Sequence, residues 1–169
     1  SLHKLRRIQD KIGARLDTSM IHPKALQKAI RRADVVIGAI RVKDERTPCV
    51  VTEEMVKMMK SLSVIVDVSI DRGGCFETSE LTTHNNPTFV KHGVIHYCVP
   101  NIPSRMARTA SFSLSNIFST LLLKIGNFGG VKNTIIQNDN ISQGVYVING
   151  NLTNKVIGDW YNLPYKTLK

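Results

Sequence analysis

The residues best suited to do chemistry lie in VIVDVSIDRGGCFETS, residues 64–79, where two carboxylates and a glycine pair follow a run of aliphatic residues. Asp71 stands where a buried strand should become a loop. It is either a ligand-binding carboxylate beyond the end of the strand or a turn residue that caps the Gly73–Gly74 loop. Position alone leaves both alternatives open. Asp67 lies inside the expected strand, and we predict a buried structural carboxylate with hydrogen-bond partners.

Cysteine and histidine chemistry has little support in the sequence. Cys49, Cys75 and Cys98 are odd in number and lack CxxC spacing, which argues against a disulfide framework and a cysteine zinc site. His96 and Cys98 share one face of an expected strand, but two ligands without a third do not make a zinc site. We predict no metal, and a reducing cytoplasm as the compartment.

Three apolar segments, 34–40, 63–70 and 93–100, are expected to be buried strands because each is nearly continuous in aliphatic residues. Helices or long crossovers separate them, which predicts an α/β fold with a parallel sheet covered on both faces. Periodicity and capping residues place the helices at 2–12, 22–33 and 52–60, the last with Thr52 as N-cap, and a short strand is possible at 14–19.

From about Arg105 onward the sequence forms a different segment. Its apolar residues recur at helical spacing over 109–126, which predicts a core helix ended by Gly126; the stripe is Leu114, Ile117, Phe118, Leu121, Leu122 and Ile125. Residues 144–162 predict a short strand, an Asn149–Gly150 turn, a second extended piece and an amphipathic helix.

Ligands of open parallel sheets bind beyond the carboxyl ends of the strands. Ile40, Ile70 with Asp71, and Asn101 with Ile102 follow the ends of the three expected strands. We therefore expect these five residues to line one crevice.

The net charge of +10 is concentrated at the front of the chain, where residues 1–60 hold 14 Lys and Arg against 7 Asp and Glu. Most of this excess falls on two amphipathic helices, for which a solvated polar face is the common explanation. Only 6% of residues are aromatic and none interleave with a basic run, so nucleic acid is a weak candidate. The apolar stretches are shorter than the roughly 20 residues of a bilayer span, and no signal peptide opens the chain, so we expect no membrane partner.

Two long stretches carry a family resemblance. VIVDVSIDRGGCFETSELTTHNNPTF and GVIHYCVPNIPSRMARTASFSLSN closely resemble bacterial alanine dehydrogenases and, more distantly, the alpha subunit of proton-translocating transhydrogenase. The resemblance runs from HKLRRIQ and RADVVIGAI to the closing NGNLTNKVIGDWYNLPY. More than fifty residues of ordered motif make this signal specific.

The resemblance implies roles for individual residues. Asp71 matches the family's essential Asp beside the nicotinamide ribose, and Lys4 matches a basic residue near the adenosine ribose. The residues implied to line the nicotinamide end are Ile40, Ile70, Asn101 and Ile102. This sequence departs from the family with Arg72 for Gln, Pro100 for Ala and Ile102 for Met; the last change alters what packs on the nicotinamide ring.

Other family features have no match in this sequence. No GxGxxG loop, whose glycines let the backbone approach a pyrophosphate, occurs in it. The family's catalytic His and pyruvate-binding Lys and Arg belong to an amino-terminal substrate domain that also has no match. We therefore expect a carboxy-terminal fragment with an incomplete Rossmann-type sheet: residues 1–104 from the NAD-binding domain, and 105–169 the linking helix and the end of the substrate domain.

The activity implied by the resemblance is NAD-dependent oxidative deamination of L-alanine to pyruvate and ammonia, by a homo-oligomer that is typically a hexamer. Alone, this chain is expected to be inactive, and either to self-associate or to take a rearranged structure, because segment 34–40 would become an apolar sheet edge. Two alternatives stay open: a nucleotide-binding transhydrogenase subunit that acts on no amino acid, and a noncatalytic module that meets an acidic partner.

Overall fold

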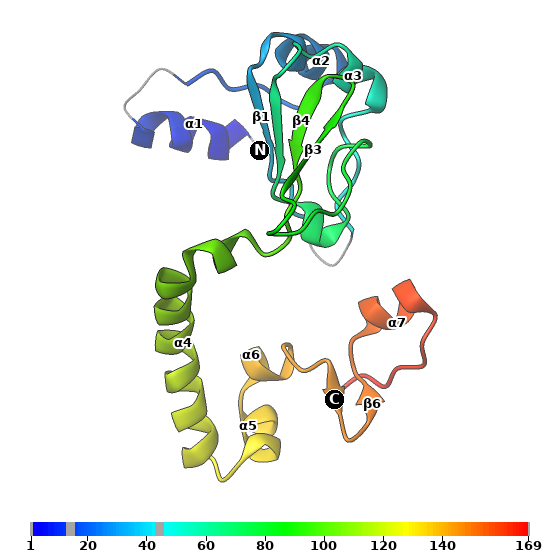
Figure 1. The fold of residues 1–169 in the computed structure, drawn as a ribbon. Helices are drawn as coiled ribbons and strands as arrows, with labels where there is room; N and C mark the ends of the chain where they lie inside the picture. The colour runs from blue at the N-terminus through cyan, green and yellow to red at the C-terminus, as the bar shows by residue number, and fades with distance from the viewer. Residues whose placement is uncertain (1, 13–15, 43–45, 169) are drawn as a thin grey trace. The chain divides into compact units, whose positions relative to one another are not determined.

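The computed structural model describes residues 2–12, 16–42 and 46–168, which form two compact units. The first extends through Pro100 and contains a four-stranded sheet, and the second begins at Asn101 and is mostly helical. Figure 1 shows the elements of each unit along the chain.

The sheet of the first unit has the strand order β1-β2-β4-β3. The strands are β1 (Val35–Gly38), β2 (Val64–Asp67), β3 (Thr88–Lys91) and β4 (Val94–Tyr97). β1, β2 and β4 are parallel, with Val35 opposite Val64 and Val64 opposite Ile95, which confirms the three predicted strands. β3 was not predicted and pairs antiparallel with β4, so the sheet is mixed.

A tight turn explains the extra strand. His92 and Gly93, between β3 and β4, have φ values of 55° and 76°. Positive φ at both central residues is typical of the two-residue hairpin turns that match strand twist. The strand before the turn is only four residues long and follows Pro87, so its apolar pattern is too short to stand out in the sequence.

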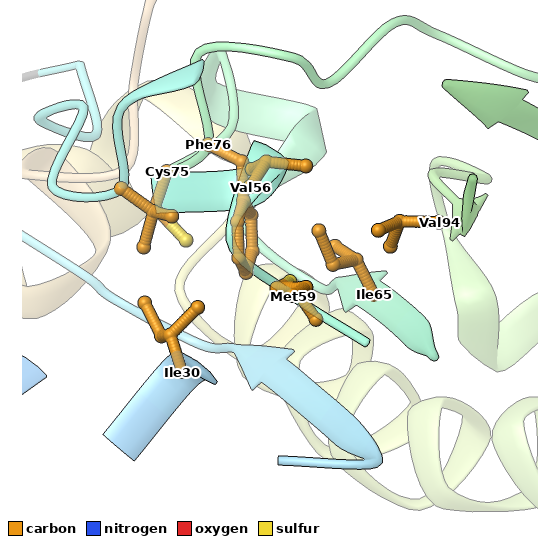
Figure 2. Packing of buried hydrophobic residues seen from close by; sticks show 8 residues of the cluster. Ile30, Val56, Met59, Ile65, Cys75, Phe76 and Val94 are labelled. Carbon is orange, nitrogen blue, oxygen red and sulfur yellow. The ribbon is translucent and has the colours of Figure 1, made fainter. Parts of the chain in front are cut away.

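One face of the sheet packs on α2 (Pro23–Arg32) and α3 (Glu53–Lys57). Figure 2 shows buried side chains of this core, which come from both helices, from the residues just after α3, from β2 and β4, and from the loop after β2: Ile30, Val56, Met59, Ile65, Cys75, Phe76 and Val94. The hydroxyl of Thr52 accepts the Met55 N–H at 3.4 Å, confirming the predicted N-cap of α3.

The opposite side of β1 is open in this chain. Val35 and Ile37 are 55% and 65% exposed, whereas Val36, between them, packs against the core. The expectation that the sheet is covered on both faces is therefore wrong for the described residues.

Two predictions concern the amino-terminal part of the chain. α1 (Leu2–Ile12) forms as predicted. The possible strand at 14–19 does not form over residues 16–19, and its first two residues lie outside the described part.

The second unit begins with the short helix η2 (Ile102–Met106) and the long helix α4 (Ala107–Asn127). α5 (Val131–Gln137) and α6 (Asp139–Ser142) follow. A hairpin of β5 (Val147–Ile148) and β6 (Asn151–Leu152) then leads to α7 (Lys155–Tyr161). Asn149 and Gly150 have φ values of 50° and 76°, which confirms the predicted turn.

The expectation that α4 is a core helix is wrong. The helix forms over the predicted segment but ends at Asn127, one residue beyond Gly126, and Gly129 and Gly130 then adopt positive φ. It is not a core helix in this chain, because Ile117 and Leu122 are 66% and 65% exposed. Within the described residues, no helix combines the length and the apolar character needed to cross a membrane.

Candidate functional site

Asp67, the last residue of β2, organises the loop that follows it. Its carboxylate is fully buried and accepts hydrogen bonds from the Ser69 N–H at 2.9 Å, the Cys75 N–H at 2.9 Å and the Ser79 hydroxyl at 2.7 Å. A buried carboxylate is tolerated only when such donors replace its water. The prediction of a structural carboxylate is therefore confirmed.

The same carboxylate requires Gly74. This residue has a φ of 76°, and a Cβ there would lie 2.7 Å from Asp67 Oδ2. Both the backbone conformation and the lack of space exclude a larger residue. The glycine pair thus lets the loop close tightly over Asp67.

Cys75 is held in this network as a thiol. Its Sγ faces Asp67 Oδ1 at 3.8 Å, and burial, reinforced by the charge of Asp67, raises the pKa of the thiol to about 12. Burial also raises the pKa of Cys98. Because the thiolate is the reactive form of cysteine, neither residue is placed to act as a nucleophile.

Asp71 lies on the short 3-10 helix η1 (Ile70–Arg72), just beyond the carboxyl end of β2. The helix ends at Gly73, whose φ is 103°, and whose N–H donates to the Ile70 carbonyl at 3.0 Å. The Gly74 N–H donates to the Ser69 carbonyl at 3.1 Å. The glycine loop is thus closed by backbone groups together with Asp67, and Asp71 stands exposed on the turn.

Ser69 joins the loop after β1 to η1. Its hydroxyl oxygen accepts the Ile40 N–H at 2.8 Å, and the hydroxyl donates to the Ile40 carbonyl at 3.0 Å. Ile40, which is partly buried, is thereby fixed beside η1. Sequence reasoning missed Ser69; the signal was a lone hydroxyl residue in VSID, at the point where strand becomes turn.

Arg72 makes a second connection between the same two loops. Its guanidinium donates to the Val42 carbonyl at 2.9 Å, and its own carbonyl accepts the Thr47 N–H at 3.0 Å. The backbone on both sides of Asp71 is therefore anchored, by Ser69 on one side and Arg72 on the other. This anchoring fixes the stretch of backbone from which the Asp71 side chain extends at the end of the sheet.

Of the six predicted site residues, the structure brings three together. Ile40, Ile70 and Asp71 lie in the first unit at the carboxyl ends of β1 and β2, although the side chain of Ile70 is only 5% exposed. Asn101 and Ile102 begin the second unit; Asn101, with a φ of 51°, precedes η2, and Ile102 is its first residue. Lys4 lies in α1, and its side chain is outside the described part of the structure.

His96 has a structural role, because its ring contacts other residues of the first unit. The Val94 carbonyl lies 3.0 Å from Nδ1, the Thr78 hydroxyl lies 2.8 Å from Nε2, and Phe89 stacks on the ring at 4.7 Å. Because a carbonyl can only accept, Nδ1 carries the proton and Nε2 of the neutral ring accepts from Thr78. Burial lowers the pKa of His96, which favours this neutral form. Both ring nitrogens are thus used within the fold.

Comparison with known proteins identifies relatives along almost the whole chain. The family model described as alanine dehydrogenase/PNT, C-terminal domain, matches residues 1–155. Alanine dehydrogenase 2 of Staphylococcus aureus, in strains USA300 and NCTC 8325 / PS 47, is 36% identical over 167 residues, which are 98% of this chain and 45% of the relative. The chain therefore spans somewhat less than half the length of these curated relatives.

Solved structures identify relatives in the same family. An L-alanine dehydrogenase superposes with a TM-score of 0.86 at 31% identity, covering 96% of this chain and 44% of that one. A transhydrogenase from Sinorhizobium meliloti superposes with a TM-score of 0.57 at 27% identity, covering 68% of this chain and 32% of that one. The incomplete Rossmann-type sheet and the helical carboxy-terminal segment are thus confirmed as the fold of this chain.

Proposed function

Because this chain belongs to the alanine dehydrogenase/PNT family, we propose that it is the carboxyl-terminal part of an NAD-dependent L-alanine dehydrogenase. The proposed reaction converts L-alanine, NAD and water reversibly to pyruvate, ammonia and NADH. One observation carries the proposal: Asp71 is an exposed carboxylate on an anchored turn at the carboxyl end of a parallel strand, which is where nucleotides bind to sheets of this class.

The residues present fit one end of NAD. A carboxylate accepts hydrogen bonds from the two hydroxyls of a ribose, and the partly buried Ile40 beside it offers an apolar surface for a ring. We propose that the main chain at Ile70, together with Asn101 and Ile102, completes the nicotinamide end and that Lys4 meets the adenosine ribose. The sequence has no GxGxxG loop, so no pyrophosphate cradle is assigned to this chain.

NAD supplies the hydride chemistry when bound, and Asp71 has a positioning role toward it. Its carboxylate accepts hydrogen bonds from the ribose and thereby fixes the orientation of the attached ring relative to the substrate. Precise orientation contributes strongly to rate, because reaction requires a narrow range of approach geometries. Ser69 and Arg72 support this role, since they hold the backbone on either side of Asp71.

The proposed domain assignment follows from the same membership. Residues 1–104 belong to the nucleotide-binding part, and residues 105–169 to the linking helix and the substrate domain. We propose a cytoplasmic homo-oligomer, with self-association of the separate chain favoured by β1. β1 is an edge strand whose side chains Val35 and Ile37 are exposed, and exposed apolar edges pair with other chains.

The test is an Asp71→Asn substitution in the complete protein that contains this chain. Asparagine keeps the size of the side chain but removes the charge that strengthens its hydrogen bonds to the ribose. We expect NADH production from L-alanine to fall by about 10²-fold or more, the scale associated with a misplaced reactive group.

A matched control separates this effect from a general loss of charge. Asp10 is exposed in α1, and Asp10→Asn should leave turnover unchanged. Circular dichroism should show that both variants retain the fold. Normal turnover by the folded Asp71→Asn protein would remove Asp71 from the mechanism.

A transhydrogenase subunit is the second candidate, favoured by the structural similarity over 68% of the chain. Such a protein would bind NADH and exchange hydride between nucleotides without acting on an amino acid. Assays of the complete protein with L-alanine and NAD, and separately with a pair of nicotinamide nucleotides, distinguish the two. Turnover in the second assay alone would replace the dehydrogenase proposal.

A further inference from the structure

α2 carries four cations and no acid. Lys24, Lys28, Arg31 and Arg32, with Gln27 and with Met58 beyond the end of α3, line a surface hollow of about 460 Å³. A second hollow of about 490 Å³ adjoins it and shares Lys28 and Arg32. Figure 1 shows α2 beside α3, near the amino end of β1. We call the first hollow the α2 trough.

The trough cations can be compared with the lysines that form ion pairs. Elsewhere Lys57, Lys60, Lys91 and Lys155 each lie within 2.9 Å of an Asp or Glu oxygen. Among the described residues, no carboxylate lies within ion-pair distance of the trough cations.

The spacing of these cations is unfavourable for the helix itself. Lys24 and Lys28, and likewise Lys28 and Arg32, are four residues apart and so repel one another on one face. Lys24 also lies in the first turn, where the helix dipole favours an acid and α2 has none. Only Arg31 and Arg32, in the last turn, suit the dipole. An anion bound between the cations would relieve this repulsion.

We propose that the α2 trough binds a compact polyphosphate group. Arg31 and Arg32 present the planar donor pairs that match phosphate oxygens, and the two lysines supply additional charge. Gln27, whose amide donates to Met58 Sδ at 3.4 Å, also lines the trough. The volume suits a small ligand.

Two features favour a compact anion over a nucleic acid strand. The ten residues of α2 extend only about 15 Å, and the residues lining the trough include no aromatic side chain on which a base could stack. The residues lining the neighbouring hollow include two of the four cations and Asp17, so the trough carries the higher positive charge and is the better site for an anion.

The site is independent of the proposed function. α2 leads into the amino end of β1, whereas Asp71 lies beyond the carboxyl end of β2. If the nicotinamide proposal fails, the proposed anion site in the α2 trough is therefore not affected. If the anion site fails, the nicotinamide proposal is likewise not affected.

The experiment is titration of the intact protein with inorganic tripolyphosphate, by calorimetry at constant ionic strength. We expect saturable binding of one anion per chain. The double variant Lys28→Gln/Arg32→Gln should weaken it at least tenfold. The matched control Arg6→Gln/Arg7→Gln removes two charges from exposed positions of α1 and should change the affinity less than twofold.

Three results would overturn the proposal. The first is the absence of saturable binding to the unmodified protein. The second is an equal loss of affinity in both double variants, which would indicate diffuse attraction to the basic front of the chain. The third is tighter binding of a DNA duplex, at equal phosphate concentration, with the same loss in both variants. Should the double variant misfold by circular dichroism, Lys24→Gln, with an expected loss of about threefold, replaces it.

Discussion

Replacing Asp67 by asparagine tests the account of the loop that presents Asp71. The substitution keeps shape and volume but converts one carboxylate oxygen into an NH₂ donor. One oxygen of Asp67 accepts from Ser69 and the other from Cys75 and Ser79. Whichever way the amide is turned, its NH₂ group therefore meets a buried backbone N–H.

The magnitude follows from these contacts. A buried donor left without an acceptor costs about 1–3 kcal/mol, and the remaining hydrogen bonds lose the strengthening that a charged acceptor gives. The expected loss is thus about 3 kcal/mol in the free energy of unfolding of the first unit. Since 1.4 kcal/mol is a factor of ten, opening of the sheet should become roughly 100-fold more frequent.

Amide hydrogen exchange followed by mass spectrometry is the suitable assay, because it reports on each unit separately. Peptides covering β2 and β4 should exchange about 100-fold faster in Asp67→Asn, while peptides covering α4 should not change. Asp71→Asn is the control, since the same chemical change at an exposed position should alter stability by less than about 0.5 kcal/mol. Equal exchange in the two variants would refute the role given to Asp67.

Three further predictions concern packing, pH and association. Gly38→Ala should lower the free energy of unfolding in urea by about 1–3 kcal/mol, because its Cβ would collide with Cys75 Sγ and lie 2.5 Å from the ring of Phe76. Gly126→Ala, with open space around its Cβ and no positive φ, is the control and should not destabilise the chain. Burial lowers the pKa of His96 below its ordinary 6.5, so the unfolded chain binds a proton that the folded chain does not. The free energy of unfolding should therefore fall as pH drops below about 6.5, and this dependence should flatten in His96→Asn. Sedimentation velocity of the separate chain should show self-association that Ile37→Lys reduces; a monomer before substitution would contradict the part given to β1.

The sequence was sufficient to place the strand ends and the carboxylates. Continuous aliphatic runs identify buried parallel strands, and the residues after them must lie at one edge of the sheet, so Ile40 and Asp71 could be located together. The partners of Asp67 were not predictable, because Ser69, Cys75 and Ser79 reach it only through the path of an irregular loop. β3 was not predicted for a related reason: its four residues, which follow Pro87, are too few to show a recognisable apolar pattern.

α4 shows a different limit of sequence reasoning. Helical spacing correctly identified its extent and its apolar residues, yet Ile117 and Leu122 are exposed in this chain. Periodicity shows which side chains share a face and carries no information on what covers that face. Ile70 is the converse case: its position after a strand predicted a ligand-lining side chain, whereas the tight turn of η1 leaves that side chain buried.

Asp67 and Asp71 are four residues apart, and their different burial indicates different roles. Asp67 stabilises the loop, and Asp71 is the proposed functional carboxylate. Asp67 uses its oxygens to fix the loop and has no exposed surface, so it is not available to a ligand. Asp71 is exposed on the turn that Asp67, Ser69 and Arg72 hold in place. If Asp71 acts as proposed, a substitution at Asp67 is expected to lower activity through the loosened support of Asp71, together with a loss of stability. A substitution at Asp71 should lower activity with the hydrogen exchange of β2 and β4 unchanged, and this combination distinguishes a functional carboxylate from a structural one.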